Sequence, residues 1–427
     1  MTQQTDGRPQ MTATVVLYSH DSVGLGHARR NRALAHALAE HLPGLLGEEV
    51  SGLLIAGHPD APADSLPDGW DWLVLPGFDR TDDGYAARRL RLTVERLAAV
   101  RGATMAGVMD SLSPDLFIAD RHPLGVDGEL RPVLSLLRER HRCATVLGLR
   151  DVLDSPWAVQ AEWAAAGGAE AVADAYDAVW IYGDRRVYCP VSTGEVPAGL
   201  ASRSLSTGYL AQGRPEDAGA AVEGSYVLTV VGGGSDGAPV ARAAAAAPPP
   251  RGHRHLVVTG PQMPEEQVRA IRLLARPETT VLRSVPHVPA LLRDAAAAVT
   301  MGGYNTLAEV MATTTPALVV PRRSRRAEQP RRAAALAAAG AVEVLPAEAC
   351  EPQALSAWFA KAVGTAVDRS AIDLGGLSRA AELAAQLIRA RRAAPMHSPH
   401  PTGVPRARAA SRPARVPTPL EALAHAH

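Results

Sequence analysis

Cysteine is scarce in this sequence of 427 residues, and its few positions exclude two classes of protein. Cys143, Cys189 and Cys350 lie far apart and show neither Cys-x-x-Cys nor any other metal-ligand spacing. A disulfide-stabilised scaffold and a cysteine-bound metal are therefore not expected, and a reduced, cytoplasmic protein is the simplest interpretation. Lysine is scarcer still, since Lys361 is the one lysine and arginine supplies the remaining basic charge.

Excess charge and long apolar runs are also absent. The 44 basic residues are balanced by 44 acidic ones, so the net charge gives no reason to expect a nucleic-acid partner. No apolar run reaches the roughly 18 residues of a membrane-spanning helix, and residues 1–10 lack the apolar segment of a signal peptide. The length is sufficient for two domains with separate cores.

What the sequence does contain is a regular alternation of short apolar segments with longer amphipathic ones. We predict strands at 14–19, 51–56, 72–75, 116–119, 144–149, 178–182, 205–209, 226–231, 255–259, 280–282, 297–300 and 317–320. Helices are predicted between them, among others at 29–42, 86–99 and 129–140. This alternation is typical of an α/β protein with doubly wound parallel sheets.

Glycines and polar residues follow three of the predicted strands in the second half of the chain. A glycine run begins at Gly232, a Gly-Gly-Tyr-Asn-Thr segment leads to Glu309, and Glu328-Gln329 comes after the next strand. Ligands of open parallel sheets bind outside the carboxyl ends of the strands. Glycines let the backbone approach a phosphate, and the first N–H groups of a helix bind one. The set suits a ribose, a diphosphate and a hydroxyl-rich group, although each segment alone could be an ordinary turn or a helix-dipole carboxylate.

Together these segments resemble the donor-binding half of GT-B glycosyltransferases, most of all the MurG-like group with a family 28 C-terminal domain. The resemblance covers about 226–345 well and the first 40 residues more loosely. In that family the glutamate of the Gly-Gly segment binds the ribose, and the later acidic-Gln pair binds the donor sugar. The implied donor-binding residues are Gly232, Gly233, Gly234, Ser235, Val285, Gly302, Gly303, Asn305, Thr306, Glu309, Glu328 and Gln329. Pro330 departs from the family pattern and leaves the sugar open.

The resemblance implies a GT-B fold, with two Rossmann-like doubly wound parallel-sheet domains facing each other across a cleft. The predicted division is a disordered N-terminus (1–12), an acceptor domain (13–211), a linker (212–224), a donor domain (225–376), a C-terminal helix that crosses back to the first domain (377–392) and a disordered tail (393–427). The tail is rich in Pro, Ala and Arg, and its seven prolines exclude a packed core.

A second glycine-containing loop follows the first strand and ends at Gly26 and His27. Arg29 stands where a dinucleotide fingerprint requires glycine, and no well-placed acid follows the second strand, which disfavours NAD binding. In GT-B enzymes the histidine of this loop lies near the acceptor. An imidazole titrates near neutral pH, so His27 is a candidate general base, the alternative being a residue that orients the loop.

Charged strand ends supply the remaining candidates. Asp120 is a candidate base, either instead of His27 or together with it. The alternative to a catalytic role is that Asp120 caps the N-terminus of the next helix. The candidate acceptor-binding residues are Gly26, Arg29, Arg150 and Asp151.

The resemblance therefore predicts transfer of a hexose-type sugar from a nucleotide diphosphate sugar to a hydroxyl acceptor. A UDP-sugar is the expected donor, with a TDP-sugar as the alternative, and the acceptor is a small or lipid-linked molecule that peripheral membrane contact could supply. The reaction is expected to invert the anomeric carbon without a metal or other cofactor. Two rival functions are a GT-B nucleotide-sugar 2-epimerase and a non-catalytic protein that binds nucleotide sugars.

Overall fold

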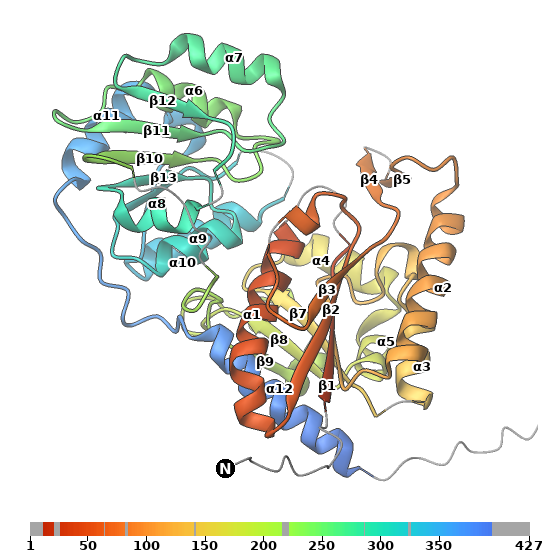
Figure 1. Ribbon diagram of the computed structural model, residues 1–427. Coiled ribbons are helices and arrows are strands. Elements are labelled where there is room, and N and C mark those ends of the chain that lie inside the picture. The colour runs from red at the N-terminus through yellow and green to blue at the C-terminus, as the bar shows by residue number, and fades with distance from the viewer. Residues whose placement is uncertain are drawn as a thin grey trace, which may run out of the picture. The chain divides into compact units, whose positions relative to one another are not determined.

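The computed structural model describes residues 12–20, 26–63, 65–81, 84–140, 142–215, 222–285, 287–322 and 326–394. The predictions of disorder for the N-terminus and the tail, and part of the predicted linker, lie outside these ranges. The described chain forms a first lobe on a seven-stranded sheet and a second lobe on a six-stranded sheet (Figure 1).

The first sheet is parallel throughout. Its strand order is β3 (Trp70–Val74), β2 (Glu49–Ala56), β1 (Thr12–Tyr18), β6 (Leu116–Asp120), β7 (Ala144–Arg150), β8 (Ala178–Tyr182) and β9 (Ser204–Ser206). Successive side chains of β1 enter opposite cores: Leu17 joins the cluster that includes α1 (Gly26–Leu46) and α12 (Gly376–Ala393), and Tyr18 joins the cluster that includes α2 (Val94–Leu112) and α3 (Arg131–Arg140). On the same side as α3 lie α4 (Pro156–Ala165) and α5 (Gly168–Ala175).

The second sheet is also parallel, in the order β12 (Thr279–Leu282), β11 (Arg254–Val258), β10 (Tyr226–Val230), β13 (Ala298–Thr300), β14 (Ala317–Val319) and β15 (Glu343–Val344). Its helices are α6 (Ala238–Ala246), α7 (Glu265–Leu274), α8 (Val288–Asp294), α9 (Tyr304–Met311), α10 (Glu328–Ala338) and α11 (Pro352–Ala362). All five residues of β10 are buried, as expected for a central strand with both faces covered.

The strand order reverses at one position in each sheet. In the first lobe β1 lies between β2 and β6, and in the second lobe β10 lies between β11 and β13. Loops that leave two such strands diverge to opposite sides and open a crevice, where ligands of doubly wound sheets bind. The segments after β1, β6, β10 and β13 carry many of the predicted site residues, and the others follow β7, β12 and β14.

The predicted helix at 86–99 is wrong in its first half. Gly84–Ala87 is strand β5, which pairs with β4 (Phe78–Thr81) in an antiparallel hairpin. Helix α2 begins only at Val94, because the hydroxyl of Thr93 accepts a hydrogen bond from the backbone N–H of Arg96 and caps the helix. The strand predicted at 205–209 is shorter than expected, since β9 ends at Ser206.

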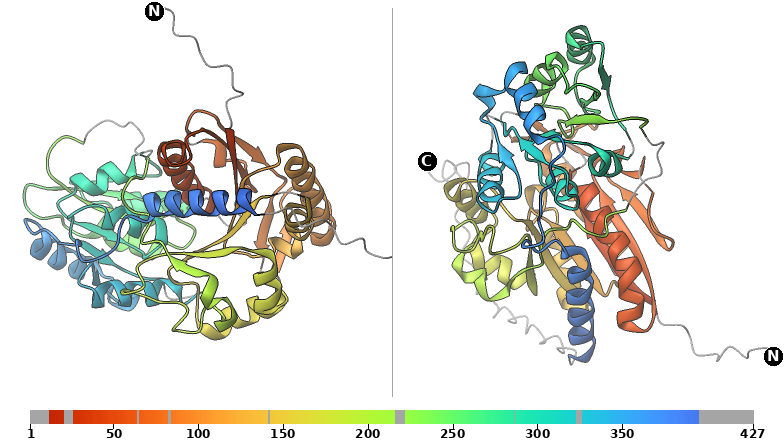
Figure 2. Two further views of the ribbon diagram at one scale, coloured as in Figure 1. Left: turned by 90° about the horizontal axis from the view of Figure 1, so that it is seen from below. Right: turned by 90° about the vertical axis from the view of Figure 1, so that its left-hand side faces the viewer.

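The last helix returns to the first lobe. Helix α12 runs alongside α1 (Figure 2), and its apolar side packs into the same core cluster. Arg391 Nε donates to Asp177 Oδ2 at 2.9 Å, and Arg392 Nε donates to Asp115 Oδ1 at 2.9 Å. Across the part of the chain that the structure describes, none of the helices is both long and apolar enough to cross a membrane.

Candidate active site

His27 and Asp120 meet at the carboxyl ends of β1 and β6. His27 Nδ1 lies 3.0 Å from Asp120 Oδ2, and Arg30 Nη2 lies 2.5 Å from the same oxygen. Burial alone would raise the pKa of the Asp120 carboxyl, but the charges of Arg30 and His27 and their hydrogen bonds outweigh burial and lower the pKa to about 2. Asp120 is therefore ionised near neutral pH.

The ionisation of Asp120 favours one tautomer of His27. Arg30 Nη2 lies 3.2 Å from His27 Nδ1, but the contact of Nδ1 with Asp120 is shorter, at 3.0 Å. A carboxylate only accepts hydrogen bonds, so this contact favours a proton on Nδ1 and leaves the Nε2 lone pair to accept another proton. Burial and the charges of Arg30 and Arg150 together lower the pKa of His27 more than Asp120 raises it, so the ring is neutral near pH 7. This is the protonation state that a general base needs.

Two further histidines extend the site and were not predicted as part of it. The ring of His20 lies 4.5 Å, centroid to centroid, from the rings of both His27 and His122. Burial lowers the pKa of His20 and of His122 well below its usual range, so both rings are neutral. The Asp120-Arg121-His122 run contained the signal for His122, whereas His20 gave none beyond its place after the first strand.

The backbone bends sharply directly after Asp120. Arg121 has φ of 71°, a left-handed conformation that costs a non-glycine residue about 1 to 2 kcal/mol. Its amide still donates to Gly148 O of β7 at 2.8 Å, and its guanidinium donates to Glu162 at 2.8 Å. The neighbouring strand and the side chain's ion pair thus hold the bend that separates Asp120 from His122.

The glycine run after β10 forms a tight turn into helix α6. Gly232 and Gly234 have φ of 66° and 92°. A Cβ at Gly234 would lie 2.2 Å from Thr259 O, so only glycine fits there. Gly233 and Ser235 are exposed, and no side chain caps the start of α6. The N–H groups of Ala238 and Val240 therefore remain available to an anion, whereas Pro239 between them has none.

Arg322 binds two acidic side chains beside this turn. Its Nη1 donates to Asp236 at 3.1 Å, its Nη2 donates to Glu328 at 2.5 Å, and its backbone N–H donates to Gln329 Oε1 at 3.1 Å. Asp236 alone would repel a diphosphate, and Arg322 neutralises it. Neither Arg322 nor Asp236 is among the predicted site residues.

Glu309 lies on α9 with its side chain only 2% exposed. Its Oε1 accepts a hydrogen bond from Arg29 of the first lobe at 3.0 Å, and Arg214 Nη1 lies 3.5 Å from the same atom. Glu309 Oε2 is buried and has no hydrogen-bond partner among the described residues. A buried carboxylate oxygen without a donor is costly, and a ligand hydroxyl would satisfy it.

The rest of the Gly-Gly segment touches the first lobe. Asn305 Nδ2 donates to Gly26 O at 2.8 Å, and Asn305 Oδ1 accepts from Arg214 at 3.1 Å. Gly303 is the N-cap of α9, and Thr306 is buried within its first turn. Val285 is half-buried before α8 and packs against the core cluster that includes Leu291 and Leu292 of that helix.

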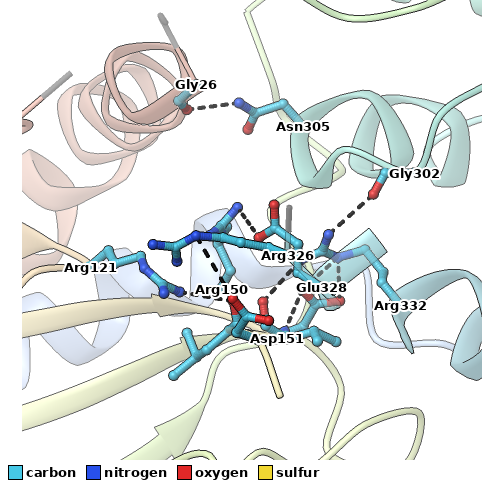
Figure 3. A network of polar contacts seen from close by, with 12 residues as sticks. Gly26, Arg121, Arg150, Asp151, Gly302, Asn305, Arg326, Glu328 and Arg332 are labelled. Atoms are coloured by element: carbon cyan, nitrogen blue, oxygen red, sulfur yellow. Dashed lines mark hydrogen bonds and ion pairs between the residues drawn. The ribbon is translucent and has the colours of Figure 1, made fainter. Parts of the chain in front are cut away.

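Arg150 and Asp151 bind second-lobe side chains (Figure 3). Arg150 Nη1 lies 2.6 Å from Glu328 Oε2, and the charge of Arg150 helps to lower the pKa of Glu328 to about 2 although burial opposes this. Arg332 Nε donates to both oxygens of Asp151, at 2.8 and 3.1 Å, and its Nη1 donates to Gly302 O at 3.1 Å. Asp151 is 0% exposed and its carboxylate is occupied by Arg332, so its predicted contact with an acceptor would require this ion pair to open.

A cavity of about 520 Å³ lies in the first lobe beside His122. Its wall comes from the segment 121–131, from α4 and from Arg326 of the second lobe. In the described chain, no group of three or more His, Cys, Asp or Glu side chains is arranged to hold a metal ion.

Residues 227–366 match the model of the glycosyltransferase family 28 C-terminal domain. The chain as a whole shares the GT-B fold of solved glycosyltransferases, and the comparison spans both lobes. The second lobe thus matches a glycosyltransferase domain, and the two lobes have the GT-B fold. These findings confirm the predicted resemblance and fold, and they support the predicted class of enzyme. A search of curated protein sequences found no match.

Three solved structures show how similar this chain is to known glycosyltransferases. Spinosyn forosaminyltransferase SpnP is 16% identical, with a TM-score of 0.54 over 88% of this chain and 95% of SpnP. Glycosyltransferase VinC in complex with DTDP is 17% identical, with a TM-score of 0.52 over 90% of this chain and 96% of VinC. Phytolacca americana UGT2, complexed with UDP-2fluoro-glucose and pterostilbene, is 13% identical, with a TM-score of 0.53 over 88% and 94%. At these identities the likeness concerns the fold alone.

Proposed function

We propose that this glycosyltransferase moves a hexose-type sugar from a UDP-sugar to a hydroxyl of its acceptor, with inversion and with His27 as the general base. One observation carries the proposal. His27 lies between two residues that touch the predicted donor segment, since Gly26 O accepts from Asn305 at 2.8 Å and Arg29 donates to Glu309 at 3.0 Å. The start of α1, which carries the candidate base, therefore contacts α9, which carries the candidate ribose ligand.

The proposed reaction is a direct displacement. His27 Nε2 takes the proton of the acceptor hydroxyl, whose oxygen attacks the anomeric carbon of the donor. The bond from that carbon to the diphosphate breaks, and UDP leaves with the electron pair. Asp120 stays ionised and stabilises the imidazolium that forms, because its carboxylate already holds Nδ1–H at 3.0 Å.

The charge that develops on UDP needs donors that are in place before the reaction. We assign this role to the backbone amides from Gly232 to Gly237, to the start of α6 and to Arg322. Glu309 Oε2 would accept a hydrogen bond from a ribose hydroxyl while Oε1 keeps its contact with Arg29, so binding of the ribose requires no ion pair to break. Glu328 and Gln329 are proposed to bind the donor sugar.

The proposed nucleotide of the donor is a pyrimidine nucleoside diphosphate. VinC was solved with DTDP and the Phytolacca enzyme with UDP-2fluoro-glucose. Both ligands contain a pyrimidine nucleoside diphosphate, which supports the same class of nucleotide here. We favour uridine, and the two bases are compared directly in the test.

The test is a thermal-shift panel of UDP, dTDP, GDP, ADP and NAD followed by product analysis. A ligand that binds only the folded protein stabilises it by mass action, so UDP should raise the melting temperature the most. His27→Ala should keep this shift and lose acceptor-dependent sugar transfer by about 10² to 10⁴-fold. A shift with NAD alone, or full transfer by His27→Ala, contradicts the proposal. Conversion of the UDP-sugar into an epimer without acceptor would establish the 2-epimerase instead.

A further inference from the structure

We infer that the first-lobe cavity binds the acceptor, and that this acceptor combines an apolar body with an anionic group, a carboxylate or a phosphate. The inference rests on the proposed function, because it names the class of molecule that the reaction glycosylates. It depends on the shape, the wall and the charge of the cavity.

The size and the wall of the cavity suit a small organic molecule. Its volume of about 520 Å³ falls within the range of small-molecule pockets. Part of its wall is apolar, supplied by Leu124, Leu149, Leu153, Val159 and Trp163, and the rest is polar or charged. Such a wall favours a ring or a short hydrocarbon chain over a freely hydrated sugar.

Basic side chains outnumber acidic ones in the wall of the cavity. Four arginines line it, namely Arg80, Arg121, Arg131 and Arg326, against the two acids Asp127 and Glu162. Glu162 is already bound, since it accepts from Arg121 at 2.8 Å and from Arg326 at 3.0 Å. His122 is neutral because burial lowers its pKa. The wall therefore carries an excess of two positive charges.

Arg131 is the arginine best placed to meet an anion. It is exposed, and none of the ion pairs or hydrogen bonds within the described residues involves its guanidinium. It is also the first residue of α3, a position where the helix dipole disfavours a cation and favours an anion. Arg80 is comparable, since its guanidinium lies over the ring of Tyr85 at 4.7 Å and leaves its charge without an acidic partner in the described chain.

The cavity adjoins the candidate base. His122 belongs to the cavity wall, and the ring of His20 contacts both His122 and His27. Arg121 and His122 directly follow Asp120 in the chain, so the cavity and the base pair share the carboxyl end of β6. To react, the hydroxyl of a molecule in this cavity would have to extend past His122 and His20 toward His27 Nε2.

The experiment compares three probes that share one ring system and one hydroxyl. They are 6-hydroxy-2-naphthoate, its methyl ester and naphthalene-2,6-diol monophosphate, and naphthalene fluorescence reports their binding to the full chain. Either anion should bind about tenfold more tightly than the neutral ester, because a partly buried ion pair is worth on the order of one factor of ten. The tighter of the two anions identifies the carboxylate or the phosphate as the natural group.

Variants connect this preference to the cavity. Arg131→Gln should reduce the preference for the anions about fivefold, since the exposed side chain forms a partly screened pair. Arg138→Gln is the matched control, because Arg138 is an exposed arginine of the same helix that does not line the cavity. Ala165→Trp, a change at an exposed lining position, should block the anions and the ester alike without altering the core.

Three results would overturn the inference: equal binding of anions and ester, no binding of any probe, or the same loss in Arg138→Gln as in Arg131→Gln. The UDP thermal shift is measured on each variant in parallel. A normal UDP shift together with any of these results refutes the acceptor class alone. Loss of the UDP shift in the unaltered chain refutes the proposed function, whatever the naphthalene probes show.

Discussion

Replacement of Asp120 by Asn tests the proposed base most directly. The change keeps the size of the side chain and removes its negative charge. Asp120 is 0% exposed and is hydrogen-bonded to both His27 and Arg30, so no water can replace the lost carboxylate without rearrangement. Two separate effects should follow, one on the rate and one on stability.

The rate should fall because an Asn amide no longer fixes the proton on His27 Nδ1. The amide NH₂ can donate to Nδ1 instead, which would place the ring proton on Nε2 and remove the base. We expect a fall in kcat of about 10² to 10⁴-fold, the usual contribution of a general base. The carboxylate also raises the pKa of His27, so any residual activity should extend to lower pH in the variant than in the parent.

The effect on the free energy of unfolding can be derived from the pKa of Asp120. The pKa of Asp120 falls from 3.8 to about 2 on folding, which corresponds to about 2 kcal/mol at 1.36 kcal/mol per pKa unit. A depressed carboxyl pKa stabilises the fold above the unfolded value, and this contribution disappears as the pH falls from about 4 to about 2. The variant should therefore unfold about 2 kcal/mol more easily at pH 7, and the two proteins should converge near pH 2.

The assay measures UDP release at varied acceptor concentration, with the UDP dissociation constant and urea unfolding measured in parallel. Asp177→Asn is the control, because Asp177 pairs with Arg391 away from the candidate site and should affect stability but not kcat at saturating substrate. A variant at Asp120 that keeps kcat within about threefold of the parent, at unchanged UDP affinity, would refute the assigned role of the pair.

Three further predictions concern the donor site and the lobe contacts. Glu309→Gln should weaken UDP binding about tenfold or more, measured by calorimetry, because it removes the charge of the candidate ribose ligand. Gly234→Ala should weaken UDP binding by at least tenfold, because its φ of 92° and its packing exclude a Cβ, whereas Gly107→Ala, which meets open space, should not. Arg332→Met should lower the free energy of unfolding by about 3 to 5 kcal/mol, measured in urea, because it leaves Asp151 charged and buried without a partner.

Each of these predictions can fail on its own. Unchanged UDP affinity in the Glu309 variant would move the ribose elsewhere, and tight UDP binding by the Gly234 variant would separate the glycine turn from the diphosphate. Lys361→Met serves as the control for the Arg332 variant. Its exposed pair with Glu343 should contribute less than about 1 kcal/mol, so equal losses in both variants would contradict the argument from burial.

Local sequence determined the strands and the glycine turns, and it predicted the class of ligand. Strands such as β6, β7, β8 and β10 were predicted to within one residue, since a fully buried parallel strand is a short apolar run with turns on both sides. The predicted helix at 86–99 failed because its first residues pair with β4, and the amphipathic pattern of the segment does not contain that partner. Thr93 carried the missed signal for the true start of the helix.

Tertiary structure alone decided which polar residues act together. The sequence left Asp120 as either a rival or a partner of His27, and the parallel pairing of β1 with β6 makes it a partner, 93 positions away in the chain. It placed Arg29 and Asp151 with the acceptor, yet they bind Glu309 and Arg332 of the other lobe. The physical reason is that a side chain's charge state and partners depend on which strand ends and helix starts come together in space. The tight turns at the glycines, by contrast, can be predicted from the sequence, because glycine is the residue that adopts positive φ without strain.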